Sequence, residues 1–568
     1  MTTDNPLMSP PPGALDQTAP QGMPTSPFAT GVLAAWGRRA EELLESWSDW
    51  LNPIVVKEAR QAMKSRQFSI TFMLLVILGL IWTVCVIAFN VPAVYYESFG
   101  PGLLTGYYWL LSIPLLLIVP FSAFRSLAGE TEDGTFELLS ITKLSALQIV
   151  LGKLASAALQ MLVYNSALAP CIAFSYMLRG IDVISIILLL TYTNMLALLL
   201  SIIGLLLATV TRSRHWQMVI SVLLVIGLLY VGLMWNMVMT VGARESLGQM
   251  PYDMWQFWTA NLAILSFYLA FAALFLLIAA GQISFASDNK STRVRIALVI
   301  IQTLWIGWSV FVYSLRDGDF GDTYEVVLYA SVFVGAMVWA VAGAALSSER
   351  LELSPRAKRE LPQTWLGRLA FTWFNPGSGT GYIFSIVSFT ALLALQCLMG
   401  FYPGAFGQDG SPRDLTWFFL GLCLWGYLAG YLGLTRLLVA LARRRASVNV
   451  FTAFLLQVIV ALAGVLIPLI IDSFYNFSQS TYLWTYSPLE FSNWAWTITE
   501  VLDRGKGTGL QVCLPVFLVG MGIFLLNLLE AAAEVEHTRT AIPIRILEEE
   551  AALHPAPAAP RKKTPWDD

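Results

Sequence analysis

The chain has 568 residues, of which 57% are hydrophobic and only 12% are charged, and its formal net charge is −3. Its mean hydropathy of +0.65 lies far above that of a soluble domain, which excludes an ordinary soluble protein and indicates a chain that crosses a membrane many times. The small net charge gives no reason to expect a nucleic-acid partner.

Cysteine and histidine usage gives no sign of a disulfide or a metal site. The five cysteines fall inside apolar runs, and none has a C-x-x-C partner: Cys85, Cys171, Cys397, Cys423 and Cys513. The three histidines are scattered along the chain: His215, His537 and His554. We therefore expect no disulfide, no zinc site and no other metal site.

Two segments precede the first apolar run. Residues 1–35 are rich in Pro, Thr, Ser and Gly, and we expect them to be disordered. Residues 36–68 predict amphipathic helices at the membrane interface, the second of which begins with Asn52 as cap and Pro53 at its first position. The first apolar run starts near residue 68, too late and too long for a cleaved signal peptide, so we expect it to be retained as an anchor.

Twelve apolar runs follow, and each is long enough to cross a bilayer as a helix of about 20 residues. We place them near 69–89, 106–124, 149–177, 183–210, 218–241, 257–284, 296–315, 324–346, 382–399, 416–440, 450–471 and 509–529. The predicted fold class is therefore an all-α polytopic membrane protein with about twelve spans, and we expect it in the cell membrane (cytoplasmic or inner membrane).

The distribution of positive charge predicts the orientation. With both termini in the cytoplasm, the inner segments carry most of the 34 Lys and Arg residues, and the outer loops carry few. Arg443, Arg444 and Arg445 lie on an inner segment, for example, whereas the outer segment 316–323 is acidic. Because cytoplasmic loops are enriched in Lys and Arg, this pattern supports the count of twelve and places the segment 125–148 in the cytoplasm.

That segment holds a charged interruption between two apolar runs, at residues 129–139. Gly134 breaks the pattern, and Thr135 can cap a short helix in which Glu137 occupies the first turn, where a negative charge suits the helix dipole. Residues 145–148 form a capping-box sequence that opens the next span. The stretch is either a shaped element presented to a partner outside the bilayer or an ordinary solvated loop.

These residues resemble the type-2 ABC exporter permease family. The loop reads Glu130-Thr131-Glu132-Asp133-Gly134-Thr135-Phe136-Glu137-Leu138-Leu139, followed by Thr142-Lys143-Leu144-Ser145 and then by Ile149-Val150-Leu151-Gly152-Lys153. The segment before the first span, Asn52-Pro53-Ile54-Val55-Val56-Lys57-Glu58, is similar to the elbow helix of that family. The resemblance covers about residues 50–285, which hold six spans, the number in one permease domain of the family.

The resemblance implies an export permease driven by a separate ATP-binding cassette ATPase subunit. The lipid bilayer and a second permease chain, identical or different, are the further partners it implies. The first cytoplasmic loop of this chain would be the coupling element, formed by Glu130, Glu132, Gly134, Thr135, Glu137, Leu138 and Leu139. Its elbow helix would include Asn52, Pro53, Lys57, Glu58 and Arg60. No G-x-x-x-x-G-K-[ST] motif occurs in the chain, so we expect no cofactor here, ATP on the partner and no catalytic residue.

The second half departs from this pattern. It comprises spans seven and eight (286–346), an inner loop (347–381), spans nine to twelve (382–529) with an aromatic-rich outer loop (472–508), and a tail (530–568) that we expect to be disordered at its end. The inner loop lacks the G-T-x-E-L-L core and ends in a glycine-rich run that predicts a flexible lead-in.

A G-x-x-x-G pattern at Gly426 and Gly430 allows close helix packing, within the chain or in a dimer. Whether one chain or two form a transport pathway stays open, and a degenerate second permease domain is one possibility for the second half.

Three other functions compete with an ABC permease. An ion-coupled secondary transporter would place ionisable residues at mid-membrane, where the spans hold almost none. A membrane-embedded transferase could use the outer aromatic loop, where Glu490 and Glu500 flank aromatic residues, but that loop has no histidine or known motif; an aromatic belt at the interface explains it more simply. A purely structural membrane scaffold is the third.

Overall fold

The structure is a computed structural model, and a defined part of the chain can be described. That part comprises residues 53–91, 96–132, 145–210, 213–246, 250–284, 289–315, 321–350, 358, 361–362, 364–401, 415–445, 448, 450–479, 486–537, 545 and 553. The segments expected to be disordered (1–35) or amphipathic (36–51), the core of the acidic loop (133–144) and the end of the C-terminal tail therefore lie outside the described residues.

Within the described ranges the protein is helical without strands, and twelve helices are long and apolar enough to cross a membrane. They are α3 (Arg66–Phe89), α4 (Gly100–Ile113) continued by α5 (Val119–Glu132), α7 (Ala146–Met177), α8 (Val183–Val210), α9 (Arg214–Ser246), α10 (Trp255–Ile283), α11 (Ser291–Ser314), α12 (Gly321–Ser347), α15 (Ser378–Phe401), α16 (Thr416–Arg443), α17 (Val450–Gln479) and α18 (Trp494–His537). This confirms the predicted all-α polytopic membrane fold.

Large apolar side chains cover the outside of the bundle, as a bilayer requires. On α3, for example, Ile70, Met73 and Val84 are 62%, 66% and 65% exposed. In water such a continuous apolar surface would be unstable, whereas hydrocarbon chains solvate it readily. The exposed faces of these helices thus identify the lipid bilayer as the surroundings of the protein.

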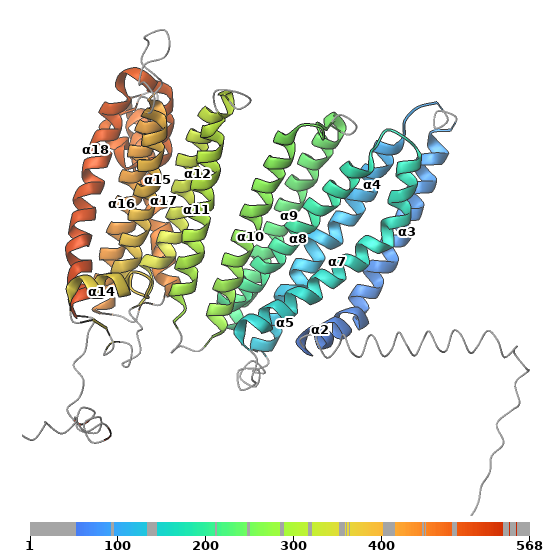
Figure 1. Ribbon diagram of the computed structural model, residues 1–568, viewed down its shortest axis with the longest axis horizontal. Coiled ribbons are helices and arrows are strands. Elements are labelled where there is room, and N and C mark those ends of the chain that lie inside the picture. The colour runs from blue at the N-terminus through green and yellow to red at the C-terminus, as the bar shows by residue number, and fades with distance from the viewer. Residues whose placement is uncertain are drawn as a thin grey trace, which may run out of the picture.

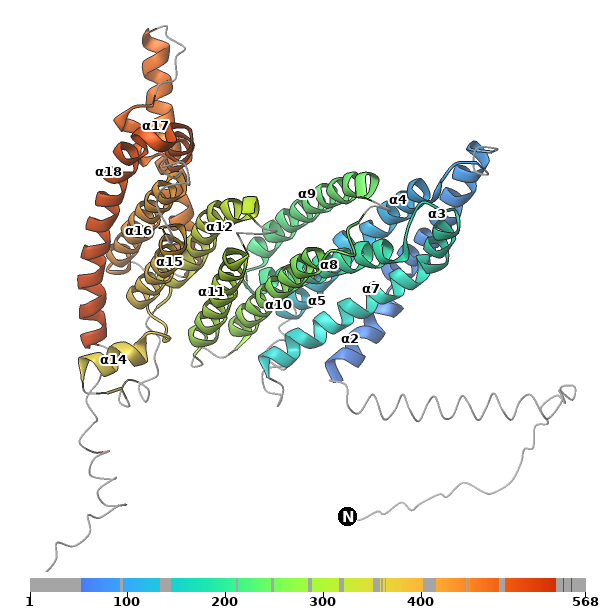
Figure 2. The same ribbon diagram turned by 45° about the horizontal axis from the view of Figure 1, so that its top comes forward.

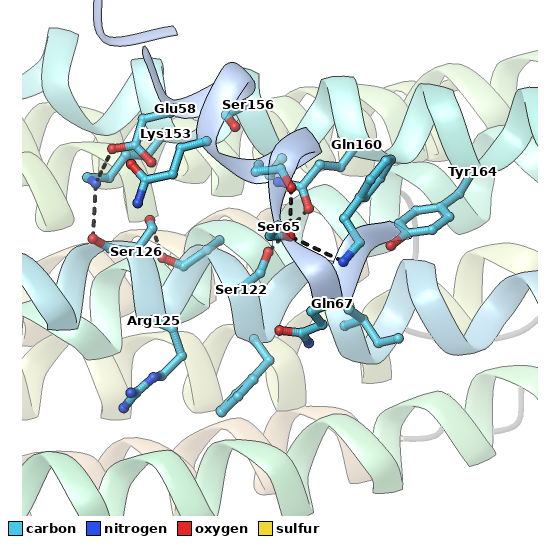
Figure 3. A pocket seen from close by; sticks show the side chains of 17 residues that line it. Glu58, Ser65, Gln67, Ser122, Arg125, Ser126, Lys153, Ser156, Gln160 and Tyr164 are labelled. Carbon is cyan, nitrogen blue, oxygen red and sulfur yellow. Dashed lines mark hydrogen bonds and ion pairs between the residues drawn. The ribbon is translucent and has the colours of Figure 1, made fainter. Parts of the chain in front are cut away.

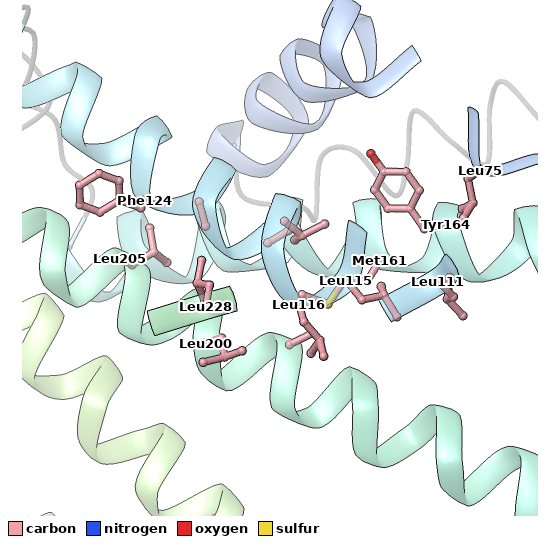
Figure 4. Close-up of a cluster of buried hydrophobic side chains, with 14 of the residues drawn as sticks. Leu75, Leu111, Leu115, Leu116, Phe124, Met161, Tyr164, Leu200, Leu205 and Leu228 are labelled. Carbon is pink, nitrogen blue, oxygen red and sulfur yellow. The ribbon is translucent and has the colours of Figure 1, made fainter. Parts of the chain in front are cut away.

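The helices form two groups, each around its own core (Figures 1 and 2). The first core joins α3 to α10 and includes Leu115, Phe124, Met161 and Leu205, as Figure 4 shows. The second core lies among α11, α12, α15, α16 and α18, with Leu274 of α10 at its edge. Helices α10 and α11 pack together where the two groups meet.

Two short helices lie at the same end of the bundle, α2 (Pro53–Lys64) and α14 (Trp365–Thr372) (Figure 1). We call this the inner end, because the Lys- and Arg-rich segments lie there. Helix α14 falls inside the segment that the sequence predicts as an inner loop, 347–381. The elbow region is also divided, since α2 stops at Lys64 and the Ser65 hydroxyl accepts a hydrogen bond from Phe68 N (3.2 Å) to start α3.

The second span contains a π-helical turn at Pro114–Ile118. Pro114 has no N–H to donate to the preceding turn. Val119 N bonds Pro114 O, five residues back, which is the hydrogen bond of a π-helical turn. The span therefore runs from Gly100 to Glu130, longer at both ends than the apolar run that predicted it.

The outer segment 472–508 differs most from expectation. Helix α17 extends to Gln479, a 3-10 turn covers Pro488–Ser492, and α18 begins at Trp494 and runs for 44 residues. The Asn493 side chain starts α18 by accepting a hydrogen bond from Trp496 N (3.2 Å). Much of the predicted aromatic loop is thus helix, and the described aromatic residues Tyr486 and Phe491 pack against the second core.

Glycines fix the closest helix crossing of the second group, between α16 and α18. A Cβ atom on Gly520 would lie 2.4 Å from Gly426 O, and a Cβ on Gly426 would lie 2.7 Å from Val516 O. Only glycine allows the two backbones to approach this closely. The G-x-x-x-G pattern therefore serves packing within the chain.

The glycine-rich run before span nine is also packed. A Cβ on Gly381 would lie 2.5 Å from Leu346 O, and Gly379 N donates a hydrogen bond to Glu534 Oε2 (3.0 Å). The predicted flexible lead-in is instead the tightly held start of α15, where absent side chains allow α12 and α18 to approach.

Candidate functional site

The helix that precedes the first span lies against the start of the third. In α2, Ile54 and Ala59 are buried, and the helix packs on α7, whereas Lys57 and Arg60 are exposed. This amphipathic pattern leaves Glu58 half-buried, on the side of α2 that faces the bundle. An acidic side chain is thereby carried to the inner end of the membrane-spanning helices.

Helix α7 begins with a complete capping box, as its sequence predicts. The Ser145 hydroxyl accepts from Gln148 N (3.3 Å), and the Gln148 side chain accepts from Ser145 N (2.9 Å). This cap fixes where α7 begins, directly after the acidic loop. About two turns later, Lys153 projects into the space between α2 and α5 (Figure 3).

Lys153 joins three elements through one buried ammonium group. Its Nζ atom lies 3.0 Å from Glu58 Oε1 and 3.0 Å from Glu130 Oε1, and it donates a hydrogen bond to Ser126 O at 3.1 Å. The side chain of Lys153 is 1% exposed, and those of Glu58 and Glu130 are 12% and 15% exposed. We call this cluster the inner junction.

The inner junction is a demanding arrangement for a lysine. Burying an ammonium ion costs several kcal/mol unless charges and hydrogen bonds surround it. Lys153 Nζ donates hydrogen bonds to Glu58 Oε1 and Ser126 O, and Glu130 adds a second carboxylate at ion-pair distance. The junction thus holds α2, the end of the second span and the start of the third at one point, and displacing any of them would separate buried charges.

A cavity of about 390 Å³ with several polar side chains in its lining adjoins the junction (Figure 3). Its lining includes Ser122, Ser156, Gln160 and Tyr164, beside Lys153 and Glu58. The Ser122 hydroxyl bonds Gln160 Oε1 (3.5 Å). The space is large enough and polar enough to hold water, which would allow the surrounding helix ends to adjust.

The structure brings together two of the residues that the resemblance singles out, Glu130 and Glu58. Glu130 lies in the last turn of α5, so the acidic stretch begins as helix, and α5 ends at Glu132. The rest of the predicted coupling element lies outside the described residues, namely Gly134, Thr135, Glu137, Leu138 and Leu139. Of the predicted elbow residues, Asn52 lies outside them, Pro53 begins α2, and Lys57 and Arg60 do not join the junction.

The sequence pattern contains Lys153 but assigns it no role. A lysine at the fifth residue of a predicted span is the signal that could have marked it, because an ionisable residue there needs a partner. Its partner Glu58 is 95 residues away in the sequence, so only the fold reveals the pair.

The second half carries its own buried charges at the inner end. Arg295 of α11, fully buried, lies 2.9 Å from Glu349 Oε2 and donates to Trp373 O at 2.7 Å. Arg436 of α16 lies 3.4 Å from Glu534 Oε2 of α18. The first pair ties α11 to the residues that follow α12, the second ties α16 to α18, and neither was predicted from the sequence.

Among the described residues, no three His, Cys, Asp or Glu side chains lie close enough together to hold a metal ion. Fold and site together define a polytopic α-helical membrane protein with buried ion pairs at one end. No protein-family model, curated protein or solved structure matches the chain.

Proposed function

We propose that the chain is the transmembrane permease subunit of an ATP-binding cassette transporter, and that it exports a substrate with energy from a separate ATPase subunit. That subunit would dock on the loop around residues 130–148. The inner junction is the observation that carries the proposal. It connects both ends of this loop, through Glu130 and Lys153, to each other and to the helix before the first span.

Such a connection suits mechanical transmission. A partner that moves the loop would pull on Glu130 at the end of the second span and on α7, which starts 14 residues after α5 ends. Because Lys153 holds both to α2, the three elements would move as a unit. The chain would then make and break no covalent bond, and its work would be a change between two arrangements of packed helices.

The positions of the buried charges favour this function over an ion-coupled transporter. Coupling ions and protons are usually bound near the bilayer midplane. Here the ion pairs of the described residues involve Lys153, Arg295 and Arg436 and lie at the inner end. A transferase site in the outer aromatic segment is also disfavoured, because Glu490, a residue of the 3-10 turn, is fully buried.

Co-purification with the ATPase tests docking. The chain should recover an ATP-binding cassette ATPase from membranes, and reversing Glu132 and Glu137 to Lys should abolish that recovery. Glu97→Lys, an exposed change at the opposite end of α3 and α4, is the matched control and should have no effect. Recovery of the chain without any ATPase, unchanged by the double reversal, would exclude the proposed docking.

A second measurement tests transmission separately from docking. Lys153→Met should keep the ATPase bound but remove the change in ATP hydrolysis that the permease imposes on it. Lys57→Met, which alters an exposed lysine of α2, should leave that change intact. If Lys153→Met preserves it as well, the inner junction has no part in coupling.

A further inference from the structure

Two polar side chains lie deep inside the second helix group without a hydrogen-bond partner. Gln396 of α15 and Ser331 of α12 are each 1% exposed. Within the part of the chain that the structure describes, no group bonds Gln396 Nε2, Gln396 Oε1 or Ser331 Oγ. Three such atoms in one apolar region cost considerable free energy of folding, because buried donors and acceptors lose their hydrogen bonds to water.

The two side chains belong to the same level of one helix interface. Helices α12 and α15 run antiparallel, and a Cβ on Gly335 would lie 2.4 Å from Leu392 Cδ2. Nearer the inner end, a Cβ on Gly343 would lie 3.2 Å from Ser385 Cβ. Continuing this register by one turn away from the inner end pairs residue 331 with residue 396. Both side chains therefore stand on facing stripes.

Another glutamine of this group shows the contrast. Gln302 of α11 donates to Ser388 O (3.3 Å) and accepts from Trp339 Nε1 (2.9 Å), so both ends of its amide are bonded to protein. The bundle can thus accommodate a buried amide by supplying a carbonyl and a donor. One and two turns from Gln396 along α15, toward the inner end, the chain instead has the apolar residues Leu392 and Phe389, which are 1% and 0% exposed.

We propose that Ser331 and Gln396 hold buried water, as one molecule or a pair, bridging α12 and α15. Water suits these groups because one molecule can donate two hydrogen bonds and accept two. Ser331 Oγ can donate or accept, Gln396 Nε2 donates, and Gln396 Oε1 accepts. A charged ligand is disfavoured, because no described ion pair involves this layer. The site is a water-mediated link between spans eight and nine, independent of the proposed transport function.

A cryo-EM map of the full chain in lipid nanodiscs, at a resolution that shows ordered water, tests this directly. We expect a density peak within hydrogen-bond distance of both Ser331 Oγ and the Gln396 amide. A map without such a peak, in which the two side chains bond each other directly or bond backbone carbonyls, overturns the proposal.

Thermal unfolding of variants tests the same site energetically. If water links the two side chains, Gln396→Met and Ser331→Ala should each lower Tm, and the double variant should be no worse than the poorer single one. If the site is dry, Gln396→Met should raise Tm, because it removes two unbonded groups. The Tm changes of Gln396→Met and Ser331→Ala should then add in the double variant, and this result overturns the proposal. Gln302→Met is the control for losing a fully bonded amide and should lower Tm independently of Ser331→Ala.

Discussion

Replacing Lys153 by methionine probes the inner junction most directly. Methionine keeps an unbranched apolar side chain, one atom shorter than that of lysine, but removes the ammonium group. Glu58 and Glu130, whose side chains are 12% and 15% exposed, would then face each other without the cation that now lies 3.0 Å from each. The substitution leaves two mostly buried carboxylates without compensation, which is much worse than losing an exposed pair.

The expected loss is about 3–5 kcal/mol in the free energy of unfolding, the typical cost of removing one partner from a buried ion pair. Exposure of the carboxylates places the expected value at the lower end, about 3 kcal/mol, since water can reach part of each group. Neutralising all three groups together, as Glu58→Gln, Glu130→Gln and Lys153→Met, should recover part of this loss, because no uncompensated charge remains.

Reversible denaturation of the purified chain in mixed micelles would measure these free energies. Lys57→Met is the matched control, and we expect a change of at most about 0.5 kcal/mol, because its side chain is exposed. Two results would refute the reasoning. One is a loss for Lys153→Met as small as that of the control, and the other is a triple variant that is less stable than the single one.

Three further predictions concern other parts of the fold. Gly520→Ala should cost about 1–3 kcal/mol, because its Cβ would lie 2.4 Å from Gly426 O, whereas Gly522→Ala, with nothing within 4 Å, should be neutral or stabilising in thermal unfolding. Ser145→Ala should cost about 0.5–2 kcal/mol by removing the cap of α7, and an unchanged Tm would contradict this. Burial would raise the pKa of Asp182, but hydrogen bonds from Ser185 and Tyr252 outweigh it and lower the pKa below its ordinary value. The stability that Asp182 contributes is thus present above its unfolded pKa of about 4 and is lost as pH falls through the lower, folded value, so the Tm difference between wild type and Asp182→Asn should shrink in that range.

The spans could be predicted because the bilayer imposes a simple requirement on the sequence. In hydrocarbon, backbone N–H and C=O groups find no water to bond, and a helix pairs them within one segment. Each run of about 20 apolar residues was therefore expected to be a membrane-spanning helix. Helix ends were less predictable, since beyond the hydrocarbon other contacts decide. Residues 494–508, with Glu500, Asp503 and three nearby glycines, suggest a loop, yet α18 starts there because Asn493 caps it and Val501 packs into the second core.

The candidate site was only half predictable for a related reason. Local patterns predicted the Ser145 cap, since all its groups lie within four residues. They could not show that Glu58 meets Lys153, because that contact depends on α2 packing against α7. The same limit hid the pair of Arg295 and Glu349, which are 54 residues apart.

The locations of the buried polar groups suggest how the two halves could behave under load. Ion pairs at the inner end resist separation strongly, because parting them leaves charges in a poorly solvated place. Farther from that end, the described contacts between helices are apolar packing and hydrogen bonds without ion pairs, such as that of Tyr108 with Thr193 at 3.0 Å. Such contacts exchange partners at lower cost, above all where water can take part. A force applied at the inner end would therefore move the joined helix ends as a unit, and the rearrangement would take place among the less strongly held contacts beyond them.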